Sequence, residues 1–123
     1  CQDFAHLMLS CLRSLRLPAR YVSGYILNEP PPGKEKLLGS DASHAWVECW
    51  LPGAGWVGFD PTNGKQVNDE FIIVAWGRDF MDVTPLRGVV LGGGSHELKV
   101  SVSVIRMEAQ AEILTLPNAQ GNL

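Results

Sequence analysis

The chain has 123 residues, of which 46% are apolar and 19% are charged, with a formal net charge of −3 and a pI near 5.5. This composition predicts one globular domain over residues 1–123 and excludes a disordered or collagen-like chain. There is no basic stripe for nucleic acid or an anionic bilayer, and no apolar run approaches the roughly 20 residues of a membrane span. We therefore expect a soluble, cytoplasmic protein with no nucleic-acid or membrane partner, unless a targeting signal precedes residue 1.

Residues 2–16 predict a helix, which Pro18 brings to an end. Apolar side chains recur there at helical spacing, at Phe4, Leu7, Met8, Cys11, Leu12 and Leu15. On a helical wheel Cys1 falls about 60° from Phe4, inside this stripe, whereas His6 falls about 200° away. We expect Cys1 to face the rest of the fold and His6 to face solvent.

Two further segments read as strands. Residues 19–27 (ARYVSGYIL) are rich in β-branched and aromatic side chains, and residues 96–108 (HELKVSVSVIRME) alternate apolar with polar side chains. Residues 28–41 contain three consecutive prolines and predict an exposed loop.

The stretch SHAWVECWLPGAGWVGFDPTN, residues 43–63, predicts a β-hairpin that turns at LPGAG. Strand alternation places His44 and Trp46 on one face of the first strand and Asp60 on one face of the second. These faces coincide when the numbers of facing residues add to an even number, which requires a loop of odd length. The Pro-Gly-Ala-Gly sequence permits such a loop.

Cysteine spacing argues against a disulfide framework. Cys1 and Cys11 on one helix would lie about 15 Å apart, against a limit of roughly 7 Å between the Cα atoms of a disulfide. The sequence has no CxxC or HxxxH pattern, so we expect no metal site. Its LGGGS stretch leads into a predicted strand rather than a helix, so no nucleotide cofactor is expected.

Cys1, His44 and Asp60 have a joint chemical use. A helix N-terminus favours thiolate over thiol at Cys1, a histidine within reach can stabilise the thiolate and protonate a leaving group, and an aspartate can orient that histidine. Taken singly, a cysteine at a helix start or a histidine on a strand is more often a buried core residue than a catalytic group. The three together predict an acyl-transfer triad.

CQDFAHLMLSCLRSLRLPARYVSGYI and ASHAWVECWLPGAGWVGFDPTN resemble the core of the bacterial transglutaminase-like superfamily, a papain-like group described as cysteine proteases. VAWGRDFMDVTPLRGVV resembles its continuation, so the resemblance spans residues 1 to about 105. It implies an α+β, papain-like core with one N-terminal helix packed on an antiparallel β-sheet. It also implies that Cys1 is the nucleophile, His44 the base and acid, and Asp60 the orienting group.

The resulting expectation is a cysteine-dependent enzyme that hydrolyses peptide or isopeptide amide bonds through a thioester, with a peptide or protein substrate. Trp46 shares the His44 face and is predicted to line the substrate cleft. Three alternatives remain. They are a transglutaminase, which passes the acyl group to an amine, an N-terminal nucleophile hydrolase using the α-amine of Cys1 as base, and a catalytically silent fragment or interaction module.

Members of the superfamily continue upstream of the cysteine, so we expect this chain to lack the N-terminal portion of the catalytic core. One helix covers little of a sheet, and 123 residues bury only a modest fraction of their surface. We therefore expect an exposed apolar surface, left as a patch or covered by association into a homo-oligomer.

Overall fold

The structure is a computed structural model and describes residues 1–39, 41–97 and 99–107. In these ranges the elements are α1 (Gln2–Ser14), β1 (Ala19–Ile26), β2 (Ser43–Leu51), β3 (Gly55–Asp60), β4 (Lys65–Gln66), β5 (Phe71–Gly77) and the 3-10 helix η1 (Phe80–Asp82). The helix predicted from residue 2 and the strand predicted from residue 19 are both confirmed. The α+β fold class is confirmed as well.

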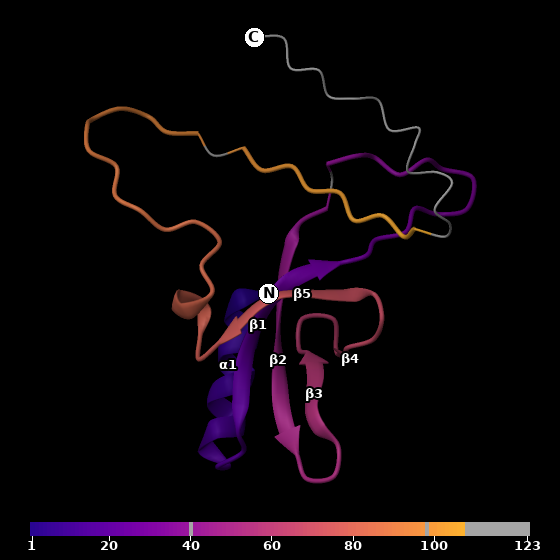
Figure 1. Cartoon of the computed structure of the whole chain (residues 1–123), viewed down its shortest axis with the longest axis vertical. Helices are drawn as coiled ribbons and strands as arrows, with labels where there is room; N and C mark the ends of the chain where they lie inside the picture. Colours follow the sequence, from indigo (N-terminus) through magenta and orange to yellow (C-terminus); the bar gives the residue numbers. More distant parts are fainter. Residues whose placement is uncertain (40, 98, 108–123) are drawn as a thin grey trace.

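The strands form one antiparallel sheet in the order β4-β3-β2-β1-β5 (Figure 1). β1 and β2 lie at its centre and pair from Ala19↔Cys49 to Tyr25↔Ser43. The long loop between them extends beyond one end of the sheet, beside the segment that approaches residue 107 (Figure 1). The hairpin β2–β3 is thus anchored on both sides by neighbouring strands.

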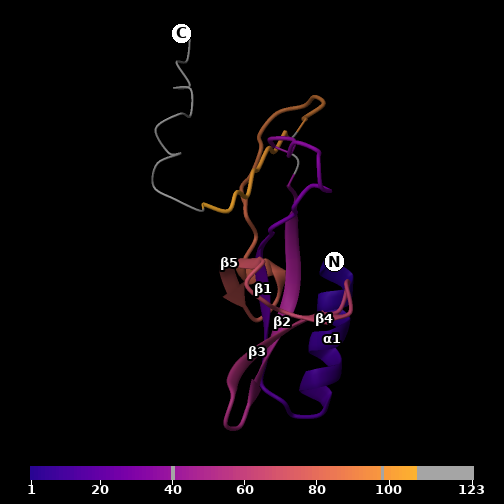
Figure 2. The same ribbon diagram turned by 90° about the vertical axis from the view of Figure 1, so that its right-hand side faces the viewer.

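Helix α1 packs on one face of the sheet (Figure 2). Ala5 and Leu9 of α1 are buried against Tyr21, Ala45 and Val47, because alternation turns odd-numbered residues of β1 and β2 toward the helix. Truncating Leu9 to alanine would cost about 2–5 kcal/mol of unfolding free energy, the usual range for a buried leucine.

A second cluster occupies the other face of the sheet. Val22, Trp46 and Phe71 are buried there, with Ile26 and Val67 packed against them. The hairpin therefore contributes to both faces, and its even-numbered β2 side chains lie away from the face that α1 covers.

The orientation predicted for His6 is wrong. Its ring lies 5.1 Å from the ring of Tyr21, between centroids, and its Nε2 accepts a hydrogen bond from the backbone N–H of Phe80 at 3.2 Å. The reason is that α1 packs on the sheet through Ala5 and Leu9, so the helix is rotated relative to the stripe that the apolar pattern indicated. A small alanine permits closer approach to the sheet than the larger apolar residues would.

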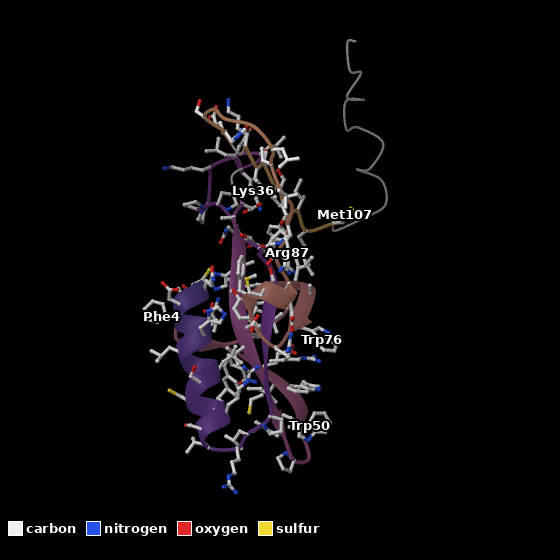
Figure 3. The ribbon with its side chains drawn as sticks, turned by 90° about the vertical axis from the view of Figure 1, so that its left-hand side faces the viewer. Phe4, Lys36, Trp50, Trp76, Arg87 and Met107 are labelled. Atoms are coloured by element: carbon white, nitrogen blue, oxygen red, sulfur yellow. The ribbon has the colours of Figure 1, made fainter. Side chains whose placement is uncertain are left out.

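Part of the predicted apolar stripe is consequently exposed. Phe4 is 55%, Leu7 63% and Leu15 70% exposed, and Cys11 is exposed too. Figure 3 shows Phe4 projecting from α1 on the side away from the sheet. The expected exposed apolar surface is thus present on this helix, and its burial by self-association remains a prediction. No helix in the described ranges has the length and apolar character needed to cross a membrane.

The hairpin loop has the predicted odd length. The facing pairs Leu51↔Gly55 and Val47↔Phe59 both have an even sum, and they leave a loop of residues 52–54. Pro52 and Gly53 are the central residues of a turn closed by a hydrogen bond from Ala54 N–H to Leu51 O at 3.1 Å. Gly53 has φ 82°, as the third residue of a type II turn requires.

The strand predicted over residues 96–108 is wrong for the part that the structure describes, residues 96, 97 and 99–107. Val102 forms only an isolated bridge with Asp41, and the neighbouring residues form no ladder. No described sheet strand lies beside this segment to pair with it, so an alternating pattern alone does not make it a strand. It lies instead on the β1–β2 loop, at the end of the molecule where Figure 3 labels Lys36.

Candidate active site

His44 and Asp60 are brought together by the hairpin. His44 is the second residue of β2 and Asp60 the last of β3, and the even register turns both side chains to one face. His44 Nε2 lies 2.9 Å from Asp60 Oδ2, within hydrogen-bond distance. Because a carboxylate can only accept, Nε2 carries the proton and Nδ1 is the acceptor nitrogen of neutral His44.

Asp60 is 1% exposed, yet its carboxylate has four hydrogen-bond donors. Oδ1 accepts from the backbone N–H groups of Thr62 at 3.0 Å and Asn63 at 3.2 Å. Oδ2 accepts from Asn63 Nδ2 at 2.7 Å as well as from His44. Burial alone raises the pKa of Asp60, but the hydrogen bonds from Asn63 and His44 outweigh it and hold this pKa below its ordinary value.

Two aromatic side chains lie beside the His44 ring. Its ring stacks on Trp46 with centroids 6.2 Å apart and lies 6.4 Å from the ring of Phe71. Trp46 is fully buried and meets Phe71 edge to face at 5.1 Å. Trp46, predicted to line the substrate cleft, thus packs beside the His44 ring, and its Nε1 is a buried donor with no hydrogen-bond partner in the described ranges.

Cys1 is the N-cap residue of α1 and is exposed. Its carbonyl accepts the first helical hydrogen bond, from Ala5 N–H at 3.0 Å, and its side chain makes no capping bond. α1 and β2 run in the same direction, so Cys1 and His44 lie toward the same end of the core (Figures 1 and 2). No hydrogen bond joins Cys1 to His44 within the described residues, and strand alternation starts the His44 side chain on the face of the sheet that α1 does not cover. The pairing of Cys1 with His44 therefore stays a prediction.

Asn63 belongs to the site, and sequence reasoning missed it. It follows Asp60 by three residues in DPTN and donates to both carboxylate oxygens. The signal was available, because aspartate followed by proline and small polar residues is typical of a turn in which the aspartate accepts from the backbone ahead of it.

A shallow hollow of about 360 Å³ lies beside Asp60, between Met8 of α1 and Lys65 and Gln66 of β4. Its walls are mainly apolar. In the described residues, no three His, Cys, Asp or Glu side chains are grouped so as to hold a metal ion.

One helix on an antiparallel sheet is an α+β arrangement consistent with a transglutaminase-like core. Comparison with family profiles matches residues 1–61 to the transglutaminase-like superfamily, and this part of the chain belongs to that superfamily. The matched range contains Cys1, His44 and Asp60. Membership suggests cysteine-dependent acyl transfer.

Several bacterial proteins are similar to the chain. An uncharacterized protein of Mycobacterium tuberculosis is 46% identical over 116 residues, covering 90% of this chain and 37% of that protein. An uncharacterized protein of Mycobacterium leprae is 43% identical over 110 residues, 87% of this chain and 37% of that protein. A protein-glutamine gamma-glutamyltransferase of Pseudomonas aeruginosa is 43% identical over 63 residues, 50% of this chain and 9% of that protein.

The chain therefore spans little more than a third of the length of its mycobacterial relatives. No solved structure matches it significantly.

Proposed function

We propose that this chain carries the catalytic centre of a cysteine-dependent enzyme that hydrolyses peptide or isopeptide amide bonds. In this proposal Cys1 is the nucleophile, His44 the general base and acid, and Asp60 the group that orients His44. The observation that carries it is the 2.9 Å contact between His44 Nε2 and a buried, hydrogen-bonded Asp60 carboxylate.

That contact supports the proposal because it selects a tautomer. With Nε2 bonded to Asp60, the acceptor nitrogen Nδ1 is left for the thiol proton of Cys1. Besides His44, three donors from the turn after β3 hold the Asp60 carboxylate in place, and the Trp46 ring stacks on the imidazole.

The reaction then has two halves. The Cys1 sulfur attacks the amide carbonyl carbon, a C–S bond forms, and the C–N bond breaks as protonated His44 gives its proton to the departing amine. Water next attacks the thioester while His44 accepts its proton. The C–S bond breaks, the sulfur is re-protonated through His44, and a carboxylic acid leaves.

The test is alkylation of Cys1 by iodoacetamide followed by assays on a mixture of peptide amides. In the unmodified chain we expect Cys1 to be alkylated faster than an exposed reference thiol, and Cys11 in the same chain supplies that reference because it is exposed. His44→Ala should bring the rate at Cys1 down to the Cys11 rate, and Cys1→Ala should abolish turnover. Equal alkylation rates in the unmodified chain would favour a silent fragment, and full turnover by Cys1→Ala would overturn the mechanism.

Transfer to an amine is the second candidate, favoured by the similarity to the Pseudomonas aeruginosa gamma-glutamyltransferase over half of this chain. The same residues would serve, with a primary amine replacing water in the second half. Supplying a glutamine-containing peptide with a primary amine and weighing the product separates the two outcomes. Hydrolysis of the glutamine carboxamide changes the peptide mass by that of water less ammonia, whereas transfer changes it by that of the amine less ammonia.

A further inference from the structure

We propose that Asn63 is a positioning residue for catalysis, which acts through Asp60 to hold His44 in its working tautomer. This inference rests on the proposed function, because it assigns a role within the same site. Asn63 lies outside the range matched to the superfamily, residues 1–61, and two residues beyond it.

The geometry singles out the side chain of Asn63. Its Nδ2 donates to Asp60 Oδ2 at 2.7 Å, and the same oxygen lies 2.9 Å from His44 Nε2. Asn63 and His44 thus approach one carboxylate oxygen together. An oxygen that already accepts from Asn63 is fixed in direction, so the remaining acceptor position points to His44.

The other donors to Asp60 lack this property. Thr62 N–H and Asn63 N–H both donate to Oδ1, the oxygen away from His44, and both belong to the backbone of the turn after β3. They anchor the carboxylate whatever side chains the turn carries. Besides His44, only the Asn63 carboxamide among the described residues is a side-chain donor to the oxygen that contacts His44, so a substitution can remove it alone.

The Asn63 carboxamide matters because few groups near the buried Asp60 carboxylate favour its ionised form. Asp60 is 1% exposed, and burial by itself disfavours the ionised carboxylate. The charged or titratable groups around it are His44 from β2 and Lys65, its facing residue on β4, and the Lys65 ammonium is 3.2 Å from Glu70. With Lys65 paired to Glu70, the hydrogen bonds from Asn63 and His44 are what favours the ionised form of Asp60 among the described residues.

The test compares three substitutions in the full 123-residue chain. Asn63→Ala removes the carboxamide but leaves the backbone N–H. Asn63→Asp keeps the shape of the side chain while replacing the donor with a second carboxylate. Thr62→Ala is the matched control, because Thr62 contacts Asp60 only through its backbone N–H, which this substitution leaves in place.

Two readouts are needed, and one is independent of turnover. NMR titration of the Asp60 carboxyl carbon should give a higher pKa in Asn63→Ala, and a still higher one in Asn63→Asp because of the like charge. In the peptide-amide assay, kcat/KM should fall about tenfold in Asn63→Ala, as expected for loss of a hydrogen bond to a charged group. The acid limb of its pH profile should move to higher pH. Thr62→Ala should match the unmodified chain in both readouts.

An unchanged Asp60 titration in both Asn63 variants would overturn the positioning role. So would an equal shift in Thr62→Ala, since that would mark a general loosening of the turn. If the unmodified chain lacks cysteine-dependent turnover, the proposed function fails and the titration alone decides whether Asn63 holds Asp60. If turnover is present and Asn63→Ala leaves the pH profile unchanged, the proposed function stands and the role of Asn63 is lost. Where Asn63→Ala unfolds, the shape-conserving Asn63→Asp supplies the same comparison.

Discussion

Two buried aspartates in this molecule are held in opposite ways. Asp60, 1% exposed, takes its partners from the turn that follows it and from His44 on the same hairpin. Asp41, 6% exposed, accepts from Val104 N–H at 2.7 Å, 63 residues further along the chain, and pairs with Lys36 at 2.9 Å. The first is a local arrangement within two paired strands, and the second ties two distant loops together.

The difference concerns cooperativity. The hairpin that carries Asp60 lies inside a five-stranded sheet, so its geometry is lost only when the sheet opens. The contacts around Asp41 join two segments that are not paired as β-strands. There Gly39 N–H donates to Ser103 Oγ at 2.6 Å, and the Lys36 ammonium donates to Val104 O. We call residues 28–39, 41 and 101–106 together the clasp, and expect it to open at lower free energy than the hairpin.

The largest expected effect is at Asp60. Asp60→Asn should retain the fold, because an amide oxygen can still accept from Thr62 and Asn63 N–H, but its amide nitrogen cannot accept from His44. Turnover of a peptide amide should fall at least about a hundredfold, since the tautomer of His44 is no longer selected by a carboxylate. Assays alongside circular dichroism measure this effect. A variant that loses its secondary structure would show that Asp60 serves the fold rather than the site.

Removing Asp41 should open the clasp and leave the sheet intact. In Asp41→Ala the Val104 N–H loses its acceptor, and the Lys36 ammonium loses its ion pair while keeping its hydrogen bond to Val104 O. Hydrogen exchange should therefore lose protection at the Val104 and Asp41 amides, while amides of β2 such as Val47 exchange as before. If protection in β2 fell equally, the clasp and the hairpin would be one cooperative unit and the contrast between them would fail.

Both aspartates should make the folded state sensitive to acid. Each has a pKa below its ordinary value, Asp60 because its hydrogen bonds outweigh burial and Asp41 chiefly through the Val104 N–H and Lys36. A carboxylate with a lowered folded-state pKa stabilises the protein above its unfolded pKa, near 4, and that contribution is lost as pH falls through the folded-state value. Urea unfolding from pH 6 to pH 2 should thus show falling stability, with a shallower fall in Asp60→Asn and in Asp41→Asn. If the free energy of unfolding fell with pH as steeply in Asp60→Asn as in the unmodified chain, the Asp60 carboxylate would have the same pKa in the folded and unfolded states.

The smallest effect on stability should come from the exposed ion pair between Arg106 and Glu29 in the clasp. Arg106 Nε lies 3.4 Å from Glu29 Oε1, and the two side chains are 46% and 67% exposed. Exposed ion pairs contribute little, so Arg106→Ala should change the free energy of unfolding by less than about 0.5 kcal/mol. Chemical denaturation of the variant beside Asp41→Ala tests this ranking. A larger loss for Arg106→Ala would mean that this ion pair, rather than buried Asp41, holds the clasp.

The local sequence determined most of the hairpin. Alternation placed His44 and Asp60 on one face, and the composition of LPGAG permitted the three-residue loop that makes the register even. Both features depend on residues within about twenty positions of one another, and strand geometry has a period of two whatever the rest of the fold does. Asn63 was within the same reach, since the turn that holds it is encoded in DPTN.

Tertiary packing decided what those patterns left open. Helix α1 packs on the sheet through Ala5 and Leu9, because the small Ala5 side chain allows a close approach to Ala45 and Val47. This packing turns His6 inward and leaves Phe4 and Leu7 exposed. The alternating residues near Val102 became part of the clasp rather than a strand, because a strand needs a partner edge and the sequence pattern does not supply one. Residues close in sequence determined the His44–Asp60 pair, whereas contacts across more than sixty residues set the surroundings of Asp41.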